Sequence, residues 1–147
     1  MTNAVWVFLI VGTLATASTA NAQGHVKHDS LYKRLGGYDA IAAVTDGFVP
    51  KLVKDPMLAK YFVHSEDTLK HIRQMAVDLL CAVTGGPCVY VGRDLKTAHK
   101  GLGISAAEWD ASVQYLVETL DELKVPMKEK NELLALVATL KADIVER

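Results

Sequence analysis

The sequence predicts an all-α domain, because its apolar residues recur with the period of a helix and not with that of a strand. In each long segment they are three or four residues apart, so they would share one face of a helix. No stretch alternates apolar and polar residues for long enough to form a β-strand. Breakers at Gly36-Gly37 and at Gly85-Gly86-Pro87 separate the segments. The pattern predicts four long helices and two short ones.

The first short helix is expected to start at Ser30, whose hydroxyl can cap it, and to end at Leu35 before the glycine pair. A long helix should follow from about Tyr38 to Val53, with Pro50 removing one backbone donor and producing a kink near Gly47. Its inward face is expected to hold Tyr38, Ile41, Thr45, Phe48 and Leu52.

A brief helical turn is expected from Asp55-Pro56 to Tyr61-Phe62, followed by a polar connection over 63–67 that contains His64. The second long helix should run from roughly Thr68 to Thr84 and stop at the Gly-Gly-Pro breaker. Its inward face is expected to hold Leu69, Ile72, Ala76, Leu79, Leu80 and Val83, with His71 at the edge.

Two further long helices complete the predicted domain. Ser105 and Glu108 form a capping box for a helix that runs to about Lys124. Pro126 opens the last helix, which is expected to continue through Ile144. Their inward residues are expected to be Trp109, Val113, Leu116, Leu120 and Leu123 in the first, and Leu133, Leu134, Val137, Leu140 and Ile144 in the second.

Composition limits the kind of protein and its partners. The chain has 147 residues and half of them are hydrophobic, enough for the core of a single domain. The 16 Lys and Arg residues are balanced by 17 Asp and Glu residues, so the formal net charge is −1. Because no basic stripe is available to neutralise phosphates, nucleic acid is not expected as a partner.

The first 22 residues carry no charged side chain and contain an apolar run from Ala4 to Ala17. Ala20 and Ala22 give the small-x-small pattern that precedes signal-peptidase cleavage, although no Lys or Arg precedes the run. The run is shorter than the ~20 residues that span a bilayer as a helix. Three segments are therefore expected: a cleaved signal peptide (1–22), a flexible N-terminus (23–29) and the folded domain (30–147).

Cleavage near Ala22 would make this an exported protein, periplasmic or secreted, with no stable membrane insertion; the alternative is an uncleaved anchor. In an oxidising compartment the two cysteines, Cys81 and Cys88, could form a disulfide across the Gly-Gly-Pro turn. Two buried thiols acting as small hydrophobes are the equal alternative.

One histidine, His99, stands out in the segment from Gly85 to Ile104, on a short helical piece. Leu95, Ala98 and Leu102 are spaced to share its face. Such a histidine is either a hydrogen-bonded core residue or a metal ligand through its neutral nitrogen, and the spacing alone favours the core residue.

Beyond periodicity, the chain carries short motifs in a fixed order. They are Leu31-Tyr32-x-x-Leu35-Gly36-Gly37, Phe48, Asp55-Pro56-x-Leu58, Tyr61-Phe62, Gly85-Gly86-Pro87-x-x-Tyr90-x-Gly92-Arg93, Ala98-His99, Gly103-Ile104 and Trp109. Each is weak alone, but in this order and spacing the chain from about Ser30 onward resembles the truncated haemoglobins, group I in particular. The resemblance implies a two-over-two globin-like helical sandwich around haem.

The resemblance also implies roles for individual residues. The family's histidine after the Gly-Gly-Pro segment is the proximal ligand of haem iron, and here it is His99. Phe62 matches the phenylalanine that packs against the porphyrin. The cofactor would be non-covalent haem b, iron protoporphyrin IX, since no Cys-x-x-Cys-His motif for covalent attachment is present. Further residues expected to line the haem are Phe48, Val49, Ile72, Ala76, Leu80 and Leu95.

The distal side departs from the family pattern. A tyrosine usually follows the phenylalanine that matches Phe48, whereas this chain has Val49. On the next helix two registers, one residue apart, are open. If Ile72 faces the iron, the pocket is apolar and dioxygen lacks a hydrogen bond worth ~1–3 kcal/mol. If His71 faces it, that residue could donate to dioxygen or become a distal iron ligand; the remaining reading of His71 is a half-exposed helix residue.

The expected function is reversible binding of a diatomic gas, namely oxygen, nitric oxide or carbon monoxide. Oxygen transport and nitric oxide detoxification are the roles considered, and the second would need nitric oxide dioxygenase-like activity with a reductase or other electron donor. The alternative function is exported haem-based electron transfer or redox sensing with bis-His iron. A haem-free helical interaction domain leaves the ordered motifs unexplained.

Overall fold

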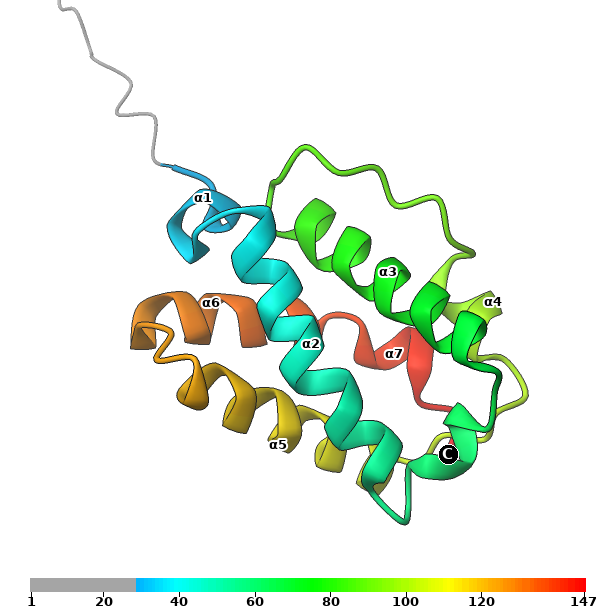
Figure 1. The fold of residues 1–147 in the computed structure, drawn as a ribbon. Coiled ribbons are helices and arrows are strands. Elements are labelled where there is room, and N and C mark those ends of the chain that lie inside the picture. Colours follow the sequence, from blue (N-terminus) through cyan, green and yellow to red (C-terminus); the bar gives the residue numbers. More distant parts are fainter. Residues whose placement is uncertain (1–28) are drawn as a thin grey trace, which may run out of the picture.

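A computed structural model of the chain describes residues 29–147, whose regular secondary structure is entirely helical (Figure 1). The all-α prediction is confirmed for this part of the chain. The expected signal peptide, 1–22, lies outside the described residues, as does all but Asp29 of the expected flexible N-terminus. The elements are α1 (Leu31–Leu35), α2 (Tyr38–Lys54), the 3₁₀ helix η1 (Ala59–Phe62), α3 (Glu66–Val83), α4 (Leu95–His99), α5 (Ala106–Glu122), α6 (Met127–Ala138) and α7 (Lys141–Ile144).

Capping residues set several of these boundaries. The Ser30 hydroxyl accepts from the Lys33 amide at the start of α1, and Gly36, at φ 108°, ends that helix in a left-handed conformation. The capping box of Ser105 and Glu108 opens α5 as expected. The helix α3 starts two residues earlier than expected, because the Ser65 hydroxyl caps it. The polar connection predicted over 63–67 was therefore too long.

The helix α2 continues through Pro50 to Lys54. Gly47, where a kink was expected, lies against α5. A β-carbon at Gly47 would come within 2.8 Å of the Thr119 Cγ2 atom, closer than van der Waals contact allows. The glycine therefore permits a close approach of the two helices, a role that the sequence pattern did not indicate.

The single last helix predicted from Pro126 to Ile144 was wrong, because it is divided into α6 and α7. At the division the Thr139 and Leu140 amides donate to carbonyls three residues earlier, on Leu136 and Val137. The Thr139 hydroxyl also donates to the Leu136 carbonyl, at 2.6 Å. These tighter bonds, together with a side chain that competes for the carbonyl, interrupt the helical ladder.

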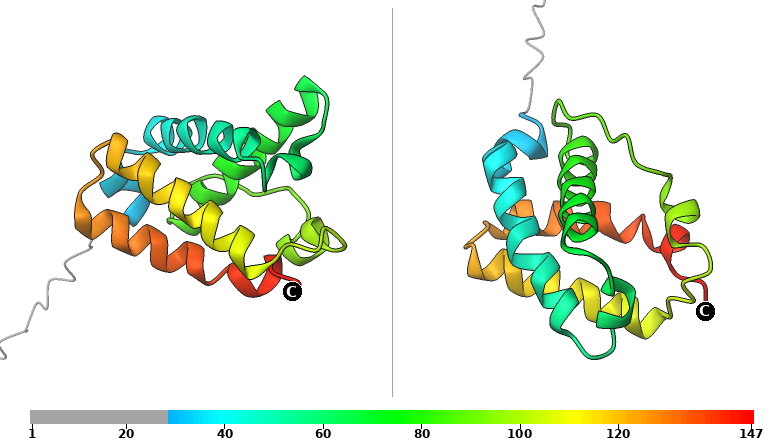
Figure 2. Two further views of the ribbon diagram at one scale, coloured as in Figure 1. Left: turned by 90° about the horizontal axis from the view of Figure 1, so that it is seen from below. Right: turned by 45° about the vertical axis from the view of Figure 1, so that its right-hand side comes forward.

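The helices form two layers, with the α2–α3 pair lying over the α5–α6 pair (Figure 2). The helix α2 packs closely against both α3 and α5. The apolar core lies between the layers and comprises Leu31, Ile41, Val44, Val77, Leu80, Cys81, Leu116, Leu120 and Leu133. This is the two-over-two sandwich that the sequence motifs implied.

Two residues predicted to face inward, and one predicted to share the helix face of His99, are exposed instead. Tyr38 is the first residue of α2 and is 40% exposed, and its hydroxyl accepts a hydrogen bond from Gln74 on the surface of α3. Leu123, 44% exposed, follows the end of α5 and precedes Lys124, whose positive φ turns the chain away. Leu102 lies beyond α4, which ends at His99, so it does not share that helix face.

Within residues 29–147, no helix combines the length and the apolar character needed to cross a membrane.

Candidate functional site

His99 is the last residue of the short helix α4 and is half-buried. Its Nδ1 atom lies 2.7 Å from the carbonyl oxygen of Leu95, one helical turn earlier. A carbonyl oxygen only accepts, so Nδ1 carries the proton in this bond and the lone pair of the neutral ring is on Nε2. Within residues 29–147 no hydrogen bond to Nε2 is found. The ring is thus oriented by one nitrogen, and the other is left to a ligand.

The helix α4 is placed by contacts at both ends. The Asp94 carboxylate caps its N-terminus by accepting from the Thr97 amide at 2.8 Å. That bond holds the pKa of Asp94 below its usual value. At the other end α4 packs beside α7 (Figure 2, right).

The face of α3 turned away from α2 is apolar and incompletely covered. On the side that faces α2, Arg73 pairs with Asp46 and Gln74 donates to Tyr38. Val77, which is fully buried, lies on the same side of α3. Roughly half a turn around the helix from Val77 lies a stripe of four partly exposed residues. The stripe consists of Ile72, Ala76, Leu79 and Val83. Among the helices of residues 29–147, α2 is the one that packs closely along α3.

The two alternatives for the distal residue are placed differently. Ile72 lies on the apolar stripe and is partly buried. His71 is exposed and lies about 100° around the helix from Ile72, outside the stripe. Leu79 and Val83 belong to the stripe but were absent from the expected haem-lining set. Leu79 comes seven residues after Ile72 and Val83 seven residues after Ala76, and this helical spacing was the signal that could have added them.

The remaining expected haem-lining residues lie on α2, η1, α3 and α4. Leu80 is buried in the core, and Phe48 packs against that core from α2 with the partly buried Val49 beside it. Leu95, which accepts from His99, opens α4 and is partly buried. Phe62 is the last residue of η1 and is partly buried.

An ion pair ties the segment that carries Phe62 to the start of α5. The Lys60 Nζ atom lies 2.5 Å from Glu108 Oε1, and the Glu108 side chain is only 4% exposed. The other oxygen, Oε2, accepts from the Ser105 amide at 2.8 Å and from its hydroxyl at 2.7 Å. The Lys60 bond, followed by these Ser105 bonds, lowers the pKa of Glu108 to about 2. The carboxylate therefore stays ionised in the folded protein at neutral pH.

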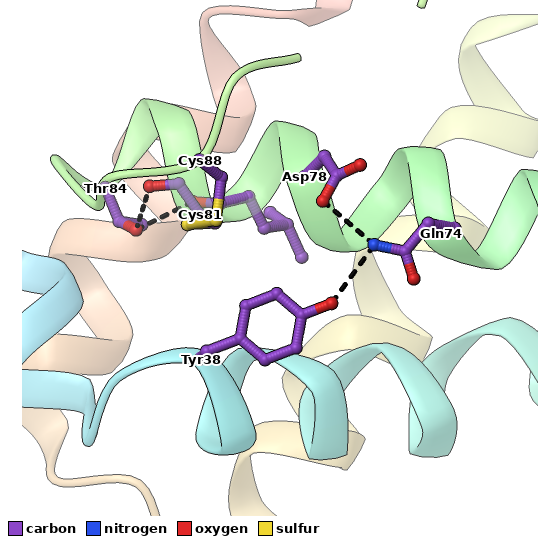
Figure 3. Close-up of a disulfide and its surroundings, with 7 residues drawn as sticks. Tyr38, Gln74, Asp78, Cys81, Thr84 and Cys88 are labelled. Carbon is purple, nitrogen blue, oxygen red and sulfur yellow. Dashed lines mark hydrogen bonds between the residues drawn. A yellow bond between two sulfur atoms is a disulfide. The ribbon is translucent and has the colours of Figure 1, made fainter. Parts of the chain in front are cut away.

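The two cysteines, for which both states were open, form a disulfide in the structure (Figure 3). Cys81 is fully buried near the end of α3, and its Cα atom is 5.7 Å from that of Cys88. A β-carbon at Gly86 would clash with Tyr32 and with Cys81, so glycine is required where the chain turns beside the bridge. The disulfide anchors the start of the irregular segment that leads from α3 to α4.

Together these features fit a haem. His99 offers a single imidazole nitrogen, which suits a metal whose other in-plane ligands come from a porphyrin. The stripe on α3 offers an apolar surface that suits the broad face of that group. Among residues 29–147, no group of three or more His, Cys, Asp or Glu side chains is arranged to hold a metal ion.

Comparison with known proteins places the chain in a family. The family model of the bacterial-like globins matches residues 30–146. The group 1 truncated haemoglobin LI410 of Chlamydomonas moewusii is 31% identical over 137 residues, which cover 90% of this chain and 79% of that protein.

Solved structures agree with this assignment. The truncated haemoglobin of Tetrahymena pyriformis in its Fe(III) form superposes with a TM-score of 0.75 at 28% identity, covering 81% of this chain and all of that one (100%). The 2/2 haemoglobin of Synechococcus sp. PCC 7002, in a cyanomet state with covalently attached haem, gives 0.73 at 27% identity, with 81% and 100% covered. The chain therefore belongs to the bacterial-like globins, among the truncated haemoglobins, and it is a haem protein that binds a diatomic gas.

Proposed function

We propose that His99 is the proximal iron ligand of a non-covalently held haem b, bound against the apolar stripe of α3. The observation that carries this proposal is the 2.7 Å bond from His99 Nδ1 to the Leu95 carbonyl. It leaves Nε2 unprotonated, with its lone pair available to a metal. When bound, haem supplies an iron with a position open to a diatomic gas.

The protein's own residues set the conditions for that binding. The Leu95 carbonyl orients the imidazole and increases its basicity as a ligand. Phe62 would pack against the porphyrin, on a segment that the Lys60–Glu108 pair ties to the start of α5. The apolar stripe on α3 would exclude water from the bound group.

The distal side is proposed to be apolar, with Ile72 and Ala76 facing the ligand and Val49 beside them. None of these side chains can donate a hydrogen bond. A gas that becomes polarised when bound, such as dioxygen, therefore gains no stabilisation from them, whereas carbon monoxide depends less on such a bond. We expect dioxygen to be held weakly relative to carbon monoxide.

The decisive experiment compares absorption spectra of the haem-loaded protein in its ferric, ferrous and carbon monoxide forms with those of His99→Gly. The variant should lose the histidine-ligated ferrous spectrum and recover it when free imidazole is added. His71→Ala is the matched control and should leave all three spectra unchanged. A His99→Gly protein with the wild-type ferrous spectrum in the absence of imidazole would refute the assignment.

The same spectra test the electron-transfer alternative. Bis-His iron requires His71 to reach the metal, and sharp split visible bands would then appear in the ligand-free ferrous protein. The exposed position of His71 does not favour this reading. A reductase or other electron donor belongs to the proposal only for nitric oxide detoxification, because that reaction oxidises the iron. Extraction of the haem by acidified organic solvent tests non-covalent attachment.

Export is proposed from the apolar run Ala4 to Ala17 and from the disulfide, which suits an oxidising compartment. The protein should then be recovered outside the cytoplasm with Gln23 as its first residue. A mass measurement of the recovered protein checks both points. Recovery of the uncut chain from the cytoplasm would contradict the proposal.

A further inference from the structure

The segment after α7 folds back onto the turn that follows His99. The Glu146 carboxylate accepts hydrogen bonds from the backbone amides of Gly101, at 2.8 Å, and of Gly103, at 2.5 Å. Both glycines have positive φ, 83° and 65°, so the turn presents both amides to one carboxylate. Within residues 29–147 the Glu146 side chain makes no ion pair, so the backbone amides are its partners.

Backbone bonds complete this attachment. The Glu146 amide donates to the Ile104 carbonyl at 2.8 Å, and the Ala106 amide donates to the Arg147 carbonyl at 2.9 Å. The Arg147 guanidinium donates through Nε to the Gly103 carbonyl at 2.6 Å. The segment therefore binds the turn from Gly101 to Ala106 at several points, more than 40 residues away in sequence. We call these bonds the Glu146 clamp.

The clamp sits next to the residue proposed to bind iron. His99 is the last residue of α4, and its carbonyl accepts from the Leu102 amide at 3.1 Å. A helix of 5 residues has little stability of its own, so its position depends on the groups that hold its ends. Asp94 holds the first end, and the clamp holds the turn at the second.

We propose that Glu146 is a positioning residue for the proximal histidine. By holding the amides of Gly101 and Gly103, its carboxylate fixes the turn that ends α4 and so fixes the direction in which His99 Nε2 points. This inference rests on the proposed role of His99. It adds that a residue outside the expected haem-lining set affects how firmly the iron is held.

The test compares Glu146→Ala with Asp143→Ala in the haem-loaded protein. Asp143 is an exposed carboxylate on α7 whose side chain makes no hydrogen bond or ion pair within residues 29–147, so the control removes the same charge nearby. Glu146→Ala should release haem to an acceptor globin roughly tenfold faster, since charge-assisted hydrogen bonds are lost. The iron–imidazole stretching band of the ferrous protein should shift or broaden, and amide hydrogen exchange should accelerate in 100–104.

Glu146→Gln keeps one carbonyl oxygen as an acceptor and should give intermediate values of all three quantities. It also carries the test if the alanine variant does not fold. Equal behaviour of Glu146→Ala and Asp143→Ala would overturn the inference. Faster haem loss with an unchanged iron–imidazole band would also overturn it, because that result means a general loss of stability.

The outcomes separate this inference from the proposed function. If the iron–imidazole band of the ferrous protein persists in His99→Gly without added imidazole, the assignment of His99 fails whatever the Glu146 variants do. If the band is present and depends on His99 but does not respond to Glu146, only the positioning role fails.

Discussion

The two helices that flank the proposed haem site are held in place by different forces. The helix α3, proposed to be distal, has 18 residues and packs along α2 with Val77, Leu80 and Cys81 buried in the core. The helix α4, proposed to be proximal, has 5 residues, none of them buried, and depends on the Asp94 cap and the Glu146 clamp. Stabilisation by buried apolar surface depends little on single charges, whereas stabilisation by a few hydrogen bonds is lost when one charged partner is removed. The distal side should therefore respond to lost volume and the proximal side to lost hydrogen bonds.

The largest expected effect tests the apolar side. Ile41→Ala removes a fully buried side chain of α2 from the core and should lower the free energy of unfolding by about 2–5 kcal/mol. Urea unfolding of the apoprotein measures the change. The matched control, Ile72→Ala, removes the same atoms from the partly exposed stripe and should destabilise the apoprotein less. Equal losses would mean that the stripe is packed as tightly as the core.

The next effect sharpens the description of the distal face. Ile72→Gln places a hydrogen-bond donor on the stripe and should slow dioxygen release roughly tenfold. Carbon monoxide release should change much less, because carbon monoxide gains little from a hydrogen bond. Flash photolysis and stopped-flow mixing measure both rates, with Ile72→Leu as the apolar control. A parallel change for both gases would show that the side chain at position 72 acts through its size and not through a hydrogen bond.

A smaller effect is expected from the N-terminal cap on the proximal side. Asp94→Ala removes the acceptor for the Thr97 amide and should weaken α4 by about 0.5–2 kcal/mol. Because α4 adds nothing to the buried core, amide hydrogen exchange should accelerate in 95–99 while the urea midpoint stays nearly constant. Asp94→Asn removes the charge but retains the cap and should behave as wild type. A large fall in the urea midpoint would contradict the local character of α4.

The last effect concerns pH and the segment that carries Phe62. The pKa of Glu108 is lowered to about 2 from an ordinary value of 4.5, so the folded state releases this proton more readily than the unfolded chain. The stability that Glu108 adds is complete above about pH 4.5 and is lost as the pH falls through about 2. The difference in unfolding free energy between wild type and Glu108→Gln should therefore narrow over that range. A constant difference from pH 7 to pH 2 would show that the contribution of Glu108 to stability does not depend on the charge of its carboxylate.

Local features of the fold could be predicted because they depend on neighbours in the sequence. The helix periods, the Ser30 cap and the Ser105–Glu108 capping box all involve residues within four positions of one another. The break at Thr139 was missed although it is also local, because a threonine hydroxyl inside a helix more often leaves the ladder intact. Tyr38 was misplaced because its position in the helical period suggests the core, but it is the first residue of α2 and its side chain lies at the surface.

The sequence by itself determined the all-α class, most helix boundaries, the family resemblance and the choice of His99. Only the tertiary structure decided which face of α3 is left open, whether Cys81 and Cys88 meet, and that Glu146 reaches the turn after His99. The physical reason is distance along the chain. Helix periodicity and capping act over a few residues, whereas the Glu146 bonds join residues more than 40 positions apart, and no local pattern encodes such a pairing. His99, the proposed iron ligand, can be singled out in the sequence, but the contacts that hold its helix are found only in the folded chain.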